Sequence, residues 1–168
     1  MIRLLAILPL VFLLCFAYSC QKGEEGAEEF GEDAHASAES IREWFDRYTS
    51  GMSSGDVDDL LSLYADSIVI LPPSGSIVAG RDEYRNWIDR FLGRYNTEEN
   101  LEIREIKIYG KNAAAWGSHN YRITHKESGI VTEGTGTFIN LFELHSNGEW
   151  MCTHNMWTSV SPPAKKEE

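Results

Sequence analysis

Apolar residues recur at helical spacing in three stretches of the first half of the chain. The first stretch follows a Ser-x-x-Glu capping box at residues 40–43 and continues to Met52, where glycines flank its end. The second is predicted to begin at Asp56 and to carry Tyr64 on its apolar face, and the third begins near Asp82. The pattern therefore predicts three helices, whose large aromatic side chains are expected to pack in a core.

The second half of the chain changes to long alternating segments, which indicate β-strands. A short apolar strand at residues 68–71 comes first and ends at a Pro-Pro turn. Four longer strands follow, with turn signals between them, at residues 102–109, 113–125, 130–145 and 149–160. Three helices followed by an antiparallel meander predict one α+β domain in which the helices cover one face of the sheet.

The last hairpin carries the strongest turn signal, an Asn-Gly pair at residues 147–148. A two-residue turn there predicts the strand pairs Leu144 with Met151, Phe142 with Thr153, Asn140 with Asn155, and Phe138 with Trp157. The opposite face of this hairpin is also largely apolar and carries Ile139, Leu141, Trp150, Cys152, His154 and Met156. A sheet with one face in water should alternate apolar with polar residues, so both faces are expected to be covered. We expect the helices on one face and a second copy of the chain on the other, in a homodimer; the termini or an N-terminal tether are the alternative cover.

Two bulky residues of the middle strand lie opposite glycines in the predicted register. A tight turn at residues 127–128 places His119 opposite Gly136. The same register places Tyr121 opposite Gly134. Both side chains would point to the helix side of the sheet, where a glycine opposite leaves room for a large neighbour. A shift of one residue in the pairing would reverse this assignment.

These side chains predict an aromatic cavity on the helix side of the sheet, with two amides and one imidazole. That composition is typical of a small-molecule pocket. The residues expected to line it are Tyr48, Tyr64, Trp87, His119, Tyr121, Phe138, Asn140, Asn155 and Trp157. The alternative is a filled core in which Asn140 and Asn155 hydrogen-bond to each other.

Residues 1–19 have the pattern of a secretory signal peptide, with one arginine, an uncharged run and small residues near the end. The run is shorter than the about 20 apolar residues that a membrane-spanning helix needs. Ser19 and Cys20 resemble the cleavage site of bacterial lipoproteins, although Tyr18 departs from that pattern. We therefore expect a lipid on Cys20 that anchors the protein in the cell envelope, at the outer membrane or surface of a Gram-negative cell. An ordinary signal peptide or an uncleaved anchor is the alternative.

The net charge of −11 owes much to the segment after this cysteine. Residues 20–36 are rich in glutamate and glycine and are expected to form a disordered tether. The folded domain then covers residues 37–160, and residues 161–168 form a loose tail. The acidic balance disfavours nucleic-acid binding. The five histidines lack the spacing of a zinc motif, so neither a metal nor another cofactor is expected.

Four segments of the chain resemble the nuclear transport factor 2-like superfamily, especially its SnoaL-like and ketosteroid-isomerase-like branch. They are residues 55–66, the Pro-Pro turn at residues 72–73, residues 80–82 and the closing segment at residues 148–159. The resemblance covers residues 37–159 and implies a cone, in which a curved antiparallel sheet wraps around three N-terminal helices and often forms dimers. The superfamily contains enzymes, binding modules and association domains, so the fold alone does not give the function.

Two departures from the resemblance concern activity. Ketosteroid isomerases carry an aspartate base where the ungapped position here is Pro72, which cannot move a proton. Related domains often carry an acid late in the sheet where this chain has Asn155, whose amide is not a base. We therefore expect an exported, lipid-anchored domain that binds a small apolar ligand and has no identifiable catalytic base. The alternatives are an isomerase, lyase or hydrolase that uses His119 with Tyr48 or Tyr64, and a protein-interaction lipoprotein.

Overall fold

The computed structural model describes residues 25–160, with side chains described from Ala34 onward. The chain divides into two units between Ser37 and Ala38, and the sheet and the cavity belong to the second. The predicted signal peptide, the predicted lipid attachment at Cys20 and the predicted C-terminal tail lie outside the described residues. None of the helices in the described part is long and apolar enough to cross a membrane.

Helix α2 extends from Glu25 to Ser54 and begins well before the predicted start. Residues 25–36 are therefore helical rather than a disordered tether, and Ser40 lies inside the helix rather than at its N-cap. Both predictions were wrong for the same reason. Alanine and glutamate are frequent in this segment, and their high helix propensity outweighs the glycines and the repulsion between acidic side chains.

Two shorter helices complete the helical part of the fold, α3 (Val57–Ser62) and α4 (Arg81–Arg94). Asp56 caps α3 as its position predicted, since its carboxylate accepts the Asp59 backbone N–H at 3.0 Å. Helix α3 ends before Tyr64, which the apolar pattern assigned to this helix. Tyr64 is instead the first residue of a strand.

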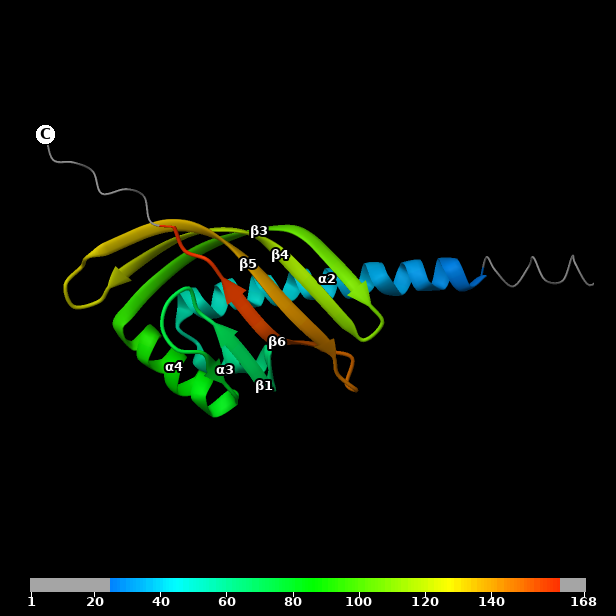
Figure 1. Ribbon diagram of the computed structural model, residues 1–168, viewed down its shortest axis with the longest axis horizontal. Coiled ribbons are helices and arrows are strands. Elements are labelled where there is room, and N and C mark those ends of the chain that lie inside the picture. Colours follow the sequence, from blue (N-terminus) through cyan, green and yellow to red (C-terminus); the bar gives the residue numbers. More distant parts are fainter. Residues whose placement is uncertain (1–24, 161–168) are drawn as a thin grey trace, which may run out of the picture. The chain divides into compact units, whose positions relative to one another are not determined.

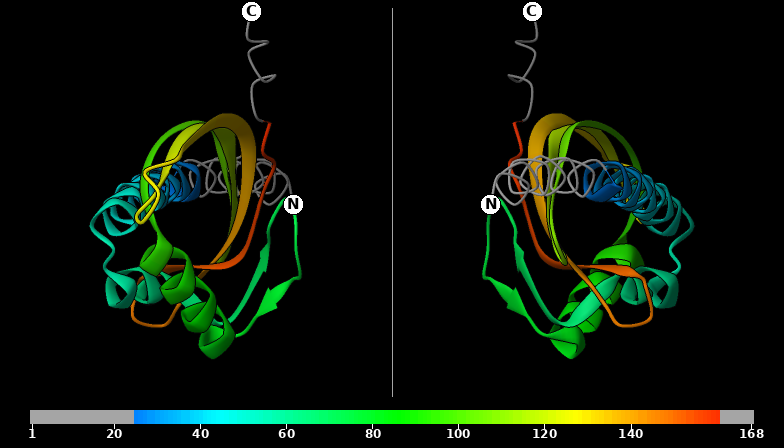
Figure 2. Two further views of the ribbon diagram at one scale, coloured as in Figure 1. Left: turned by 90° about the vertical axis from the view of Figure 1, so that its left-hand side faces the viewer. Right: turned by 90° about the vertical axis from the view of Figure 1, so that its right-hand side faces the viewer.

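One six-stranded sheet packs against the helices, with strand order β2-β1-β6-β5-β4-β3. The strands are β1 (Tyr64–Leu71), β2 (Val78–Ala79), β3 (Tyr95–Tyr109), β4 (Asn112–His125), β5 (Val131–Leu144) and β6 (Trp150–Trp157). Strands β3 to β6 form the predicted antiparallel meander, whereas β1 pairs with β6 in parallel and β2 was not predicted. The long strands arch over the helices of the domain (Figure 1), and the curvature is clearest end-on (Figure 2). The α+β fold with a curved sheet around three helices is therefore confirmed, with a sheet that is mixed rather than wholly antiparallel.

The turn of the last hairpin has three residues rather than the predicted two. Gly148 donates its N–H to the His145 carbonyl oxygen at 3.0 Å and has φ = 86°, the left-handed conformation that this turn type requires. The extra residue shifts the pairing next to the turn, so that Leu144 pairs with Trp150. The predicted partner of Leu144 was Met151, one residue further along.

A bulge at Thr153 restores the predicted register further from the turn. Beyond it Asn140 pairs with Asn155 and Phe138 pairs with Trp157, as predicted. Between the turn and the bulge the shifted pairing points Trp150 and Cys152 into the core, where both are buried. This corrects their predicted place on the outer face of the sheet.

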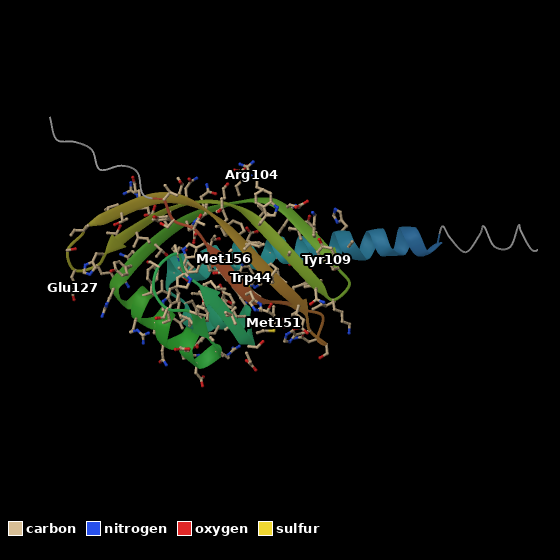
Figure 3. All side chains as sticks on the ribbon, viewed as in Figure 1. Trp44, Arg104, Tyr109, Glu127, Met151 and Met156 are labelled. Carbon is tan, nitrogen blue, oxygen red and sulfur yellow. The ribbon has the colours of Figure 1, made fainter. Side chains whose placement is uncertain are left out.

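Trp44 of α2 is the centre of the core below the sheet (Figure 3). Its indole N–H donates to the Leu63 carbonyl oxygen at 2.7 Å, which joins α2 to the end of α3. Its ring meets the rings of Phe45, Tyr64 and Phe142 edge-on, with centroids 5.1–5.4 Å apart. The rings of this cluster join α2 to strands β1 and β5.

Candidate functional site

A cavity of about 440 Å³ lies between the inner face of the sheet and helices α2 and α4. All nine residues predicted to line a pocket lie around it, contributed by two helices and four strands: Tyr48, Tyr64, Trp87, His119, Tyr121, Phe138, Asn140, Asn155 and Trp157. The structure therefore brings the whole predicted set together at one site. Their role in binding a ligand stays a prediction.

The two glycines of β5 shape the cavity as the register predicted. His119 pairs with Gly136, and Tyr121 pairs with Gly134. A Cβ atom on Gly136 would overlap the His119 ring and the Thr158 carbonyl oxygen, and one on Gly134 would overlap the Tyr121 hydroxyl. The absence of side chains at these positions therefore makes room for the polar groups of the site.

His119 is held on both sides by hydrogen-bond acceptors. Its Nδ1 lies 2.6 Å from Oε1 of Glu99 on the neighbouring strand β3, and its Nε2 lies 3.0 Å from the Thr158 carbonyl oxygen. Only 4% of the His119 side chain and 14% of the Glu99 side chain are exposed. Thr158 follows β6 and is tied to β5, since its N–H donates to the Thr137 carbonyl oxygen at 2.8 Å.

This arrangement fixes the number of protons that His119 and Glu99 share. A carbonyl oxygen only accepts, so Nε2 must carry a hydrogen and donate it to Thr158. The contact between Nδ1 and the Glu99 carboxyl group then needs one more proton, carried by the imidazole or by the carboxyl group. Burial lowers the pKa of His119, but the hydrogen bonds to Glu99 and Thr158 and the charge of Glu99 outweigh it and raise the pKa above its usual value. His119 therefore holds its second ring proton more firmly than an ordinary histidine does.

His119 was the candidate for proton transfer in the alternative, enzymatic interpretation, and its hydrogen bonds argue against that role. Both ring nitrogens are occupied within the fold, so neither is free to exchange a proton with a ligand. Glu99, by contrast, lines the cavity, where it contacts His119 through Oε1 and also has a side-chain hydrogen bond with Tyr48. Glu99 is thus the titratable group of this pair that a ligand can reach.

Glu99 was not predicted as a site residue because β3 begins at Tyr95, seven residues before the predicted start. Its inward-facing positions include Thr97, Glu99, Leu101 and Ile103, which are less exposed than the residues between them. The signal was therefore present in the sequence. The alternation of β3 continues from Ile103 toward the N-terminus, and Glu99 occupies one of the positions on the face that is otherwise mainly apolar.

Asn140 and Asn155 form the second polar group of the cavity. Nδ2 of Asn155 donates to Oδ1 of Asn140 at 2.8 Å, and Asn140 is almost completely buried. The hydrogen bond between the two asparagines was predicted as the alternative to a cavity. The structure has both the bond and the cavity. An amide has two N–H donors and a carbonyl acceptor, so this bond leaves Asn155 with a donor and an acceptor for a ligand.

Tyr48 and Tyr64 are hydrogen-bond donors rather than bases in the cavity. Burial and the nearby charge of Glu99 raise the pKa of Tyr48 well above its usual value. Burial and the neighbouring Tyr84 do the same to the pKa of Tyr64, whose ring lies 4.7 Å from that of Tyr84. Both keep their hydroxyl protons near neutral pH. In the part of the chain that the structure describes, no three side chains of His, Cys, Asp or Glu gather as a metal site.

Aromatic rings form an apolar wall opposite these polar groups. Trp87 stacks in parallel on Phe91, with ring centroids 5.7 Å apart, and meets Trp157 of β6 edge-on at 6.3 Å. Pro72 and Pro73 line the cavity as well. Flat apolar side chains of this kind fit rings of a ligand.

The comparison with protein families agrees with this geometry. A family model described as a SnoaL-like domain matches residues 41–151, which is most of the chain. The chain belongs to the SnoaL-like family. The resemblance to the nuclear transport factor 2-like superfamily inferred from the sequence is thereby confirmed. No curated protein matches this SnoaL-like chain in sequence.

Solved structures similar to the SnoaL-like chain show the same fold at low sequence identity. A conserved protein from Planctomyces limnophilus is 23% identical over 75% of this chain and 99% of its own, with a TM-score of 0.69. A ketosteroid isomerase-like protein from Erwinia carotovora is 20% identical over 73% and 95%, with a TM-score of 0.67. A candidate dehydratase of the NTF2-like family from Streptomyces avermitilis is 16% identical over 76% and 98%, with a TM-score of 0.68. At such identities the likeness concerns the fold alone.

Proposed function

We propose that this SnoaL-like domain binds a small, mainly apolar, ring-containing molecule in the cavity between the sheet and the helices. The observation that carries the proposal is the cavity itself. Its volume of about 440 Å³ falls within the range of small-molecule sites, and aromatic walls surround a few polar groups. Such a lining binds through apolar contact and orients the ligand through hydrogen bonds.

The spacing of the polar groups suggests the shape of the ligand. Asn140 and Gly136 are four residues apart on β5, and His119 lies opposite Gly136. At about 3.3 Å per residue, the amide pair and the imidazole that holds Glu99 are therefore about 13 Å apart along the strand. Phe138 and Trp157 face each other between these two levels. A ligand with a polar atom toward each end and apolar rings between them fits this order.

Tryptophan fluorescence tests the proposal, because Trp87 and Trp157 line the cavity. We expect 4,4′-dihydroxybiphenyl, which has a hydroxyl at each end, to quench the fluorescence in a saturable way. The mono-hydroxyl compound 4-hydroxybiphenyl should bind about tenfold more weakly, since a lost buried hydrogen bond costs roughly 1–1.5 kcal/mol.

The variant Asn155→Leu should reduce the affinity for the diol to that for the mono-hydroxyl compound, because it removes the amide that binds one end of the ligand. Asn112→Leu, the same change at an exposed position at the start of β4, should leave both affinities unchanged. Equal binding of the two compounds to the unaltered protein would contradict the two-ended ligand. Absence of any saturable quenching would contradict ligand binding in the cavity.

We also propose that the protein is exported and anchored by a lipid on Cys20, on the basis of the signal-like residues 1–19 and the small residue before the cysteine. Cys20→Ala is expected to leave unprocessed precursor and to abolish labelling by a radioactive fatty acid. Cys152→Ala is the control, because that thiol is buried in the folded domain and should have no part in anchoring. Labelling that persists in Cys20→Ala would contradict lipid attachment at Cys20.

A third proposal concerns the outer face of the sheet. Trp116, Ile139 and Met156 pair across β4, β5 and β6, with Leu141 beside them. We call these four residues the outer apolar patch; each is 38–46% exposed in the single chain. Adjacent exposed apolar side chains on one face mark an interaction surface. We infer that a second copy of the chain covers the patch in a two-fold homodimer.

A further inference from the structure

The polar groups that line the cavity are mostly bonded to one another. Glu99 has side-chain hydrogen bonds with Tyr48 and His119. The hydroxyl group of Tyr64 has a side-chain hydrogen bond with Tyr84. Polar groups away from water need such partners, and in this cavity the fold itself provides most of them. Much of their hydrogen-bonding capacity is therefore used before a ligand enters.

Asn155 of β6 differs from these groups, because its one hydrogen bond uses only part of the amide. Nδ2 of Asn155 donates to Oδ1 of Asn140 at 2.8 Å, and no hydrogen bond within residues 34–160 uses Oδ1 of Asn155. A primary amide has two N–H donors and a carbonyl oxygen with two lone pairs. Asn155 is half-buried and lines the cavity, so it offers a ligand one unused N–H and its carbonyl oxygen.

The direction of the Asn155 amide is set from the core side. The buried Cys152 thiol donates its hydrogen to the His154 carbonyl oxygen at 3.2 Å, and its sulfur has a second hydrogen bond with the Asn140 side chain. That sulfur must therefore accept from Nδ2 of Asn140, which turns Oδ1 of Asn140 toward Asn155. An oxygen only accepts, so Asn155 has to present its nitrogen there. The places of its oxygen and its nitrogen are thus fixed before a ligand binds.

The surroundings of Asn155 in the cavity are apolar. Ile70 of β1 pairs with Asn155, and Trp157 lies two residues further along the same face of β6. Phe138 of β5 pairs with Trp157, and all three side chains line the cavity. A donor and an acceptor that stay unpaired among such side chains cost free energy, which a ligand with matching groups recovers. A flat ring that bonds to Asn155 would lie against Trp157.

We propose that the ligand of this cavity carries a lactam, an N–H next to a carbonyl group within a flat ring, and that the lactam pairs with the amide of Asn155. The lactam carbonyl oxygen accepts from Nδ2 of Asn155, and the lactam N–H donates to Oδ1. This inference rests on the proposed binding of a ring-containing molecule and specifies the chemical group at the asparagine end of that molecule.

Other common groups match Asn155 less well. A ketone or an ether accepts from the N–H but leaves the Asn155 carbonyl oxygen unpaired. A carboxylic acid has both a donor and an acceptor, but it is ionised near neutral pH and then only accepts. A lactam stays neutral and satisfies both groups at once, and its ring supplies the flat apolar surface that the aromatic walls fit.

Calorimetric titration of the purified protein with three two-ring compounds tests the inference. 2-Quinolinone contains the lactam, 1-methyl-2-quinolinone lacks its N–H, and 2-methoxyquinoline lacks both the N–H and the carbonyl oxygen. We expect 2-quinolinone to bind about tenfold more tightly than either of the other two, which is the effect of one lost buried hydrogen bond.

The variant Asn155→Leu should bind all three compounds with equal affinity, because leucine can neither donate nor accept. Asn112→Leu, the same change at an exposed position of β4, should keep the preference for 2-quinolinone. Binding of 4-hydroxybiphenyl to Asn155→Leu checks that the cavity of this variant is intact. The test compares affinities within one protein, so a uniform change in affinity does not affect it.

The outcomes separate this inference from the binding proposal. A protein that binds 4,4′-dihydroxybiphenyl but does not prefer 2-quinolinone to the other two compounds would overturn the lactam while ligand binding stands. A preference that persists in Asn155→Leu would overturn the pairing with this residue. If neither 2-quinolinone nor the diol binds, the binding proposal is contradicted, and the inference falls with it.

Discussion

An alanine in place of Gly136 is expected to destabilise the domain by about 3 kcal/mol, because overpacking typically costs roughly 1–3 kcal/mol and two hydrogen bonds would be disturbed as well. The new methyl group would overlap the Thr158 carbonyl oxygen and the His119 ring. Gly136 does not have a positive φ, so alanine fits the backbone and the effect comes from the contacts alone. Chemical denaturation measures the loss of unfolding free energy, and the nitrogen-15 signals of His119 report whether its hydrogen bonds to Glu99 and Thr158 are broken.

Two other glycines provide graded controls. An alanine at Gly134 would meet the hydroxyl end of Tyr121, which can move aside, so the loss should be smaller than at Gly136. Gly93 lies near the end of α4 with open space around it, so Gly93→Ala should leave stability unchanged or raise it by up to about 1 kcal/mol. If Gly136→Ala proved as harmless as Gly93→Ala, the segment after β6 would not lie where the structure has it.

If the proposed homodimer forms through the outer apolar patch, a lysine in place of Met156 is expected to convert it to monomers. Met156 pairs with Ile139 in the outer apolar patch and is 45% exposed in the single chain. A two-fold interface places each patch residue against the same surface of the partner, so one substitution adds two charges to the apolar contact. Burial of unpaired charges costs several kcal/mol, which is enough to dissociate most dimers at micromolar concentration. Sedimentation velocity measures the change.

Ile77→Lys is the matched control for the dimer. Ile77 is an exposed apolar residue between β1 and β2, outside the outer apolar patch. The same gain of charge there should leave the dimer intact. A Met156→Lys protein that sediments as a dimer would move the interface to another surface, and an unaltered protein that sediments as a monomer would remove the homodimer altogether.

The sequence predicted the cavity because its signals were local and redundant. Gly134 and Gly136 lie at a fixed distance from the β4–β5 turn, so the pairing of His119 and Tyr121 with them followed from the alternation of the strands. The Asn140–Asn155 pair was predicted in the same way, although the turn next to it was misjudged. The bulge at Thr153 offset that error, and no residue pattern in the sequence predicts the bulge.

The main omission, Glu99, has a different cause. Residues 96–100 are polar and lay before the predicted start of the strand, and their strand conformation comes from pairing with β4 rather than from their own propensity. The role of His119 could not be predicted either. It depends on the Thr158 carbonyl oxygen, 39 residues away in sequence, which only the three-dimensional path of the chain after β6 brings to the ring.

Native mass spectrometry of the protein, extracted gently from the cells that make it, tests ligand binding most directly. We predict a discrete extra mass of a small organic molecule on the folded chain, reduced in Asn155→Leu and retained in Asn112→Leu. A chain of bare mass that also fails to take up 4,4′-dihydroxybiphenyl would contradict the binding function and leave the cavity without a ligand.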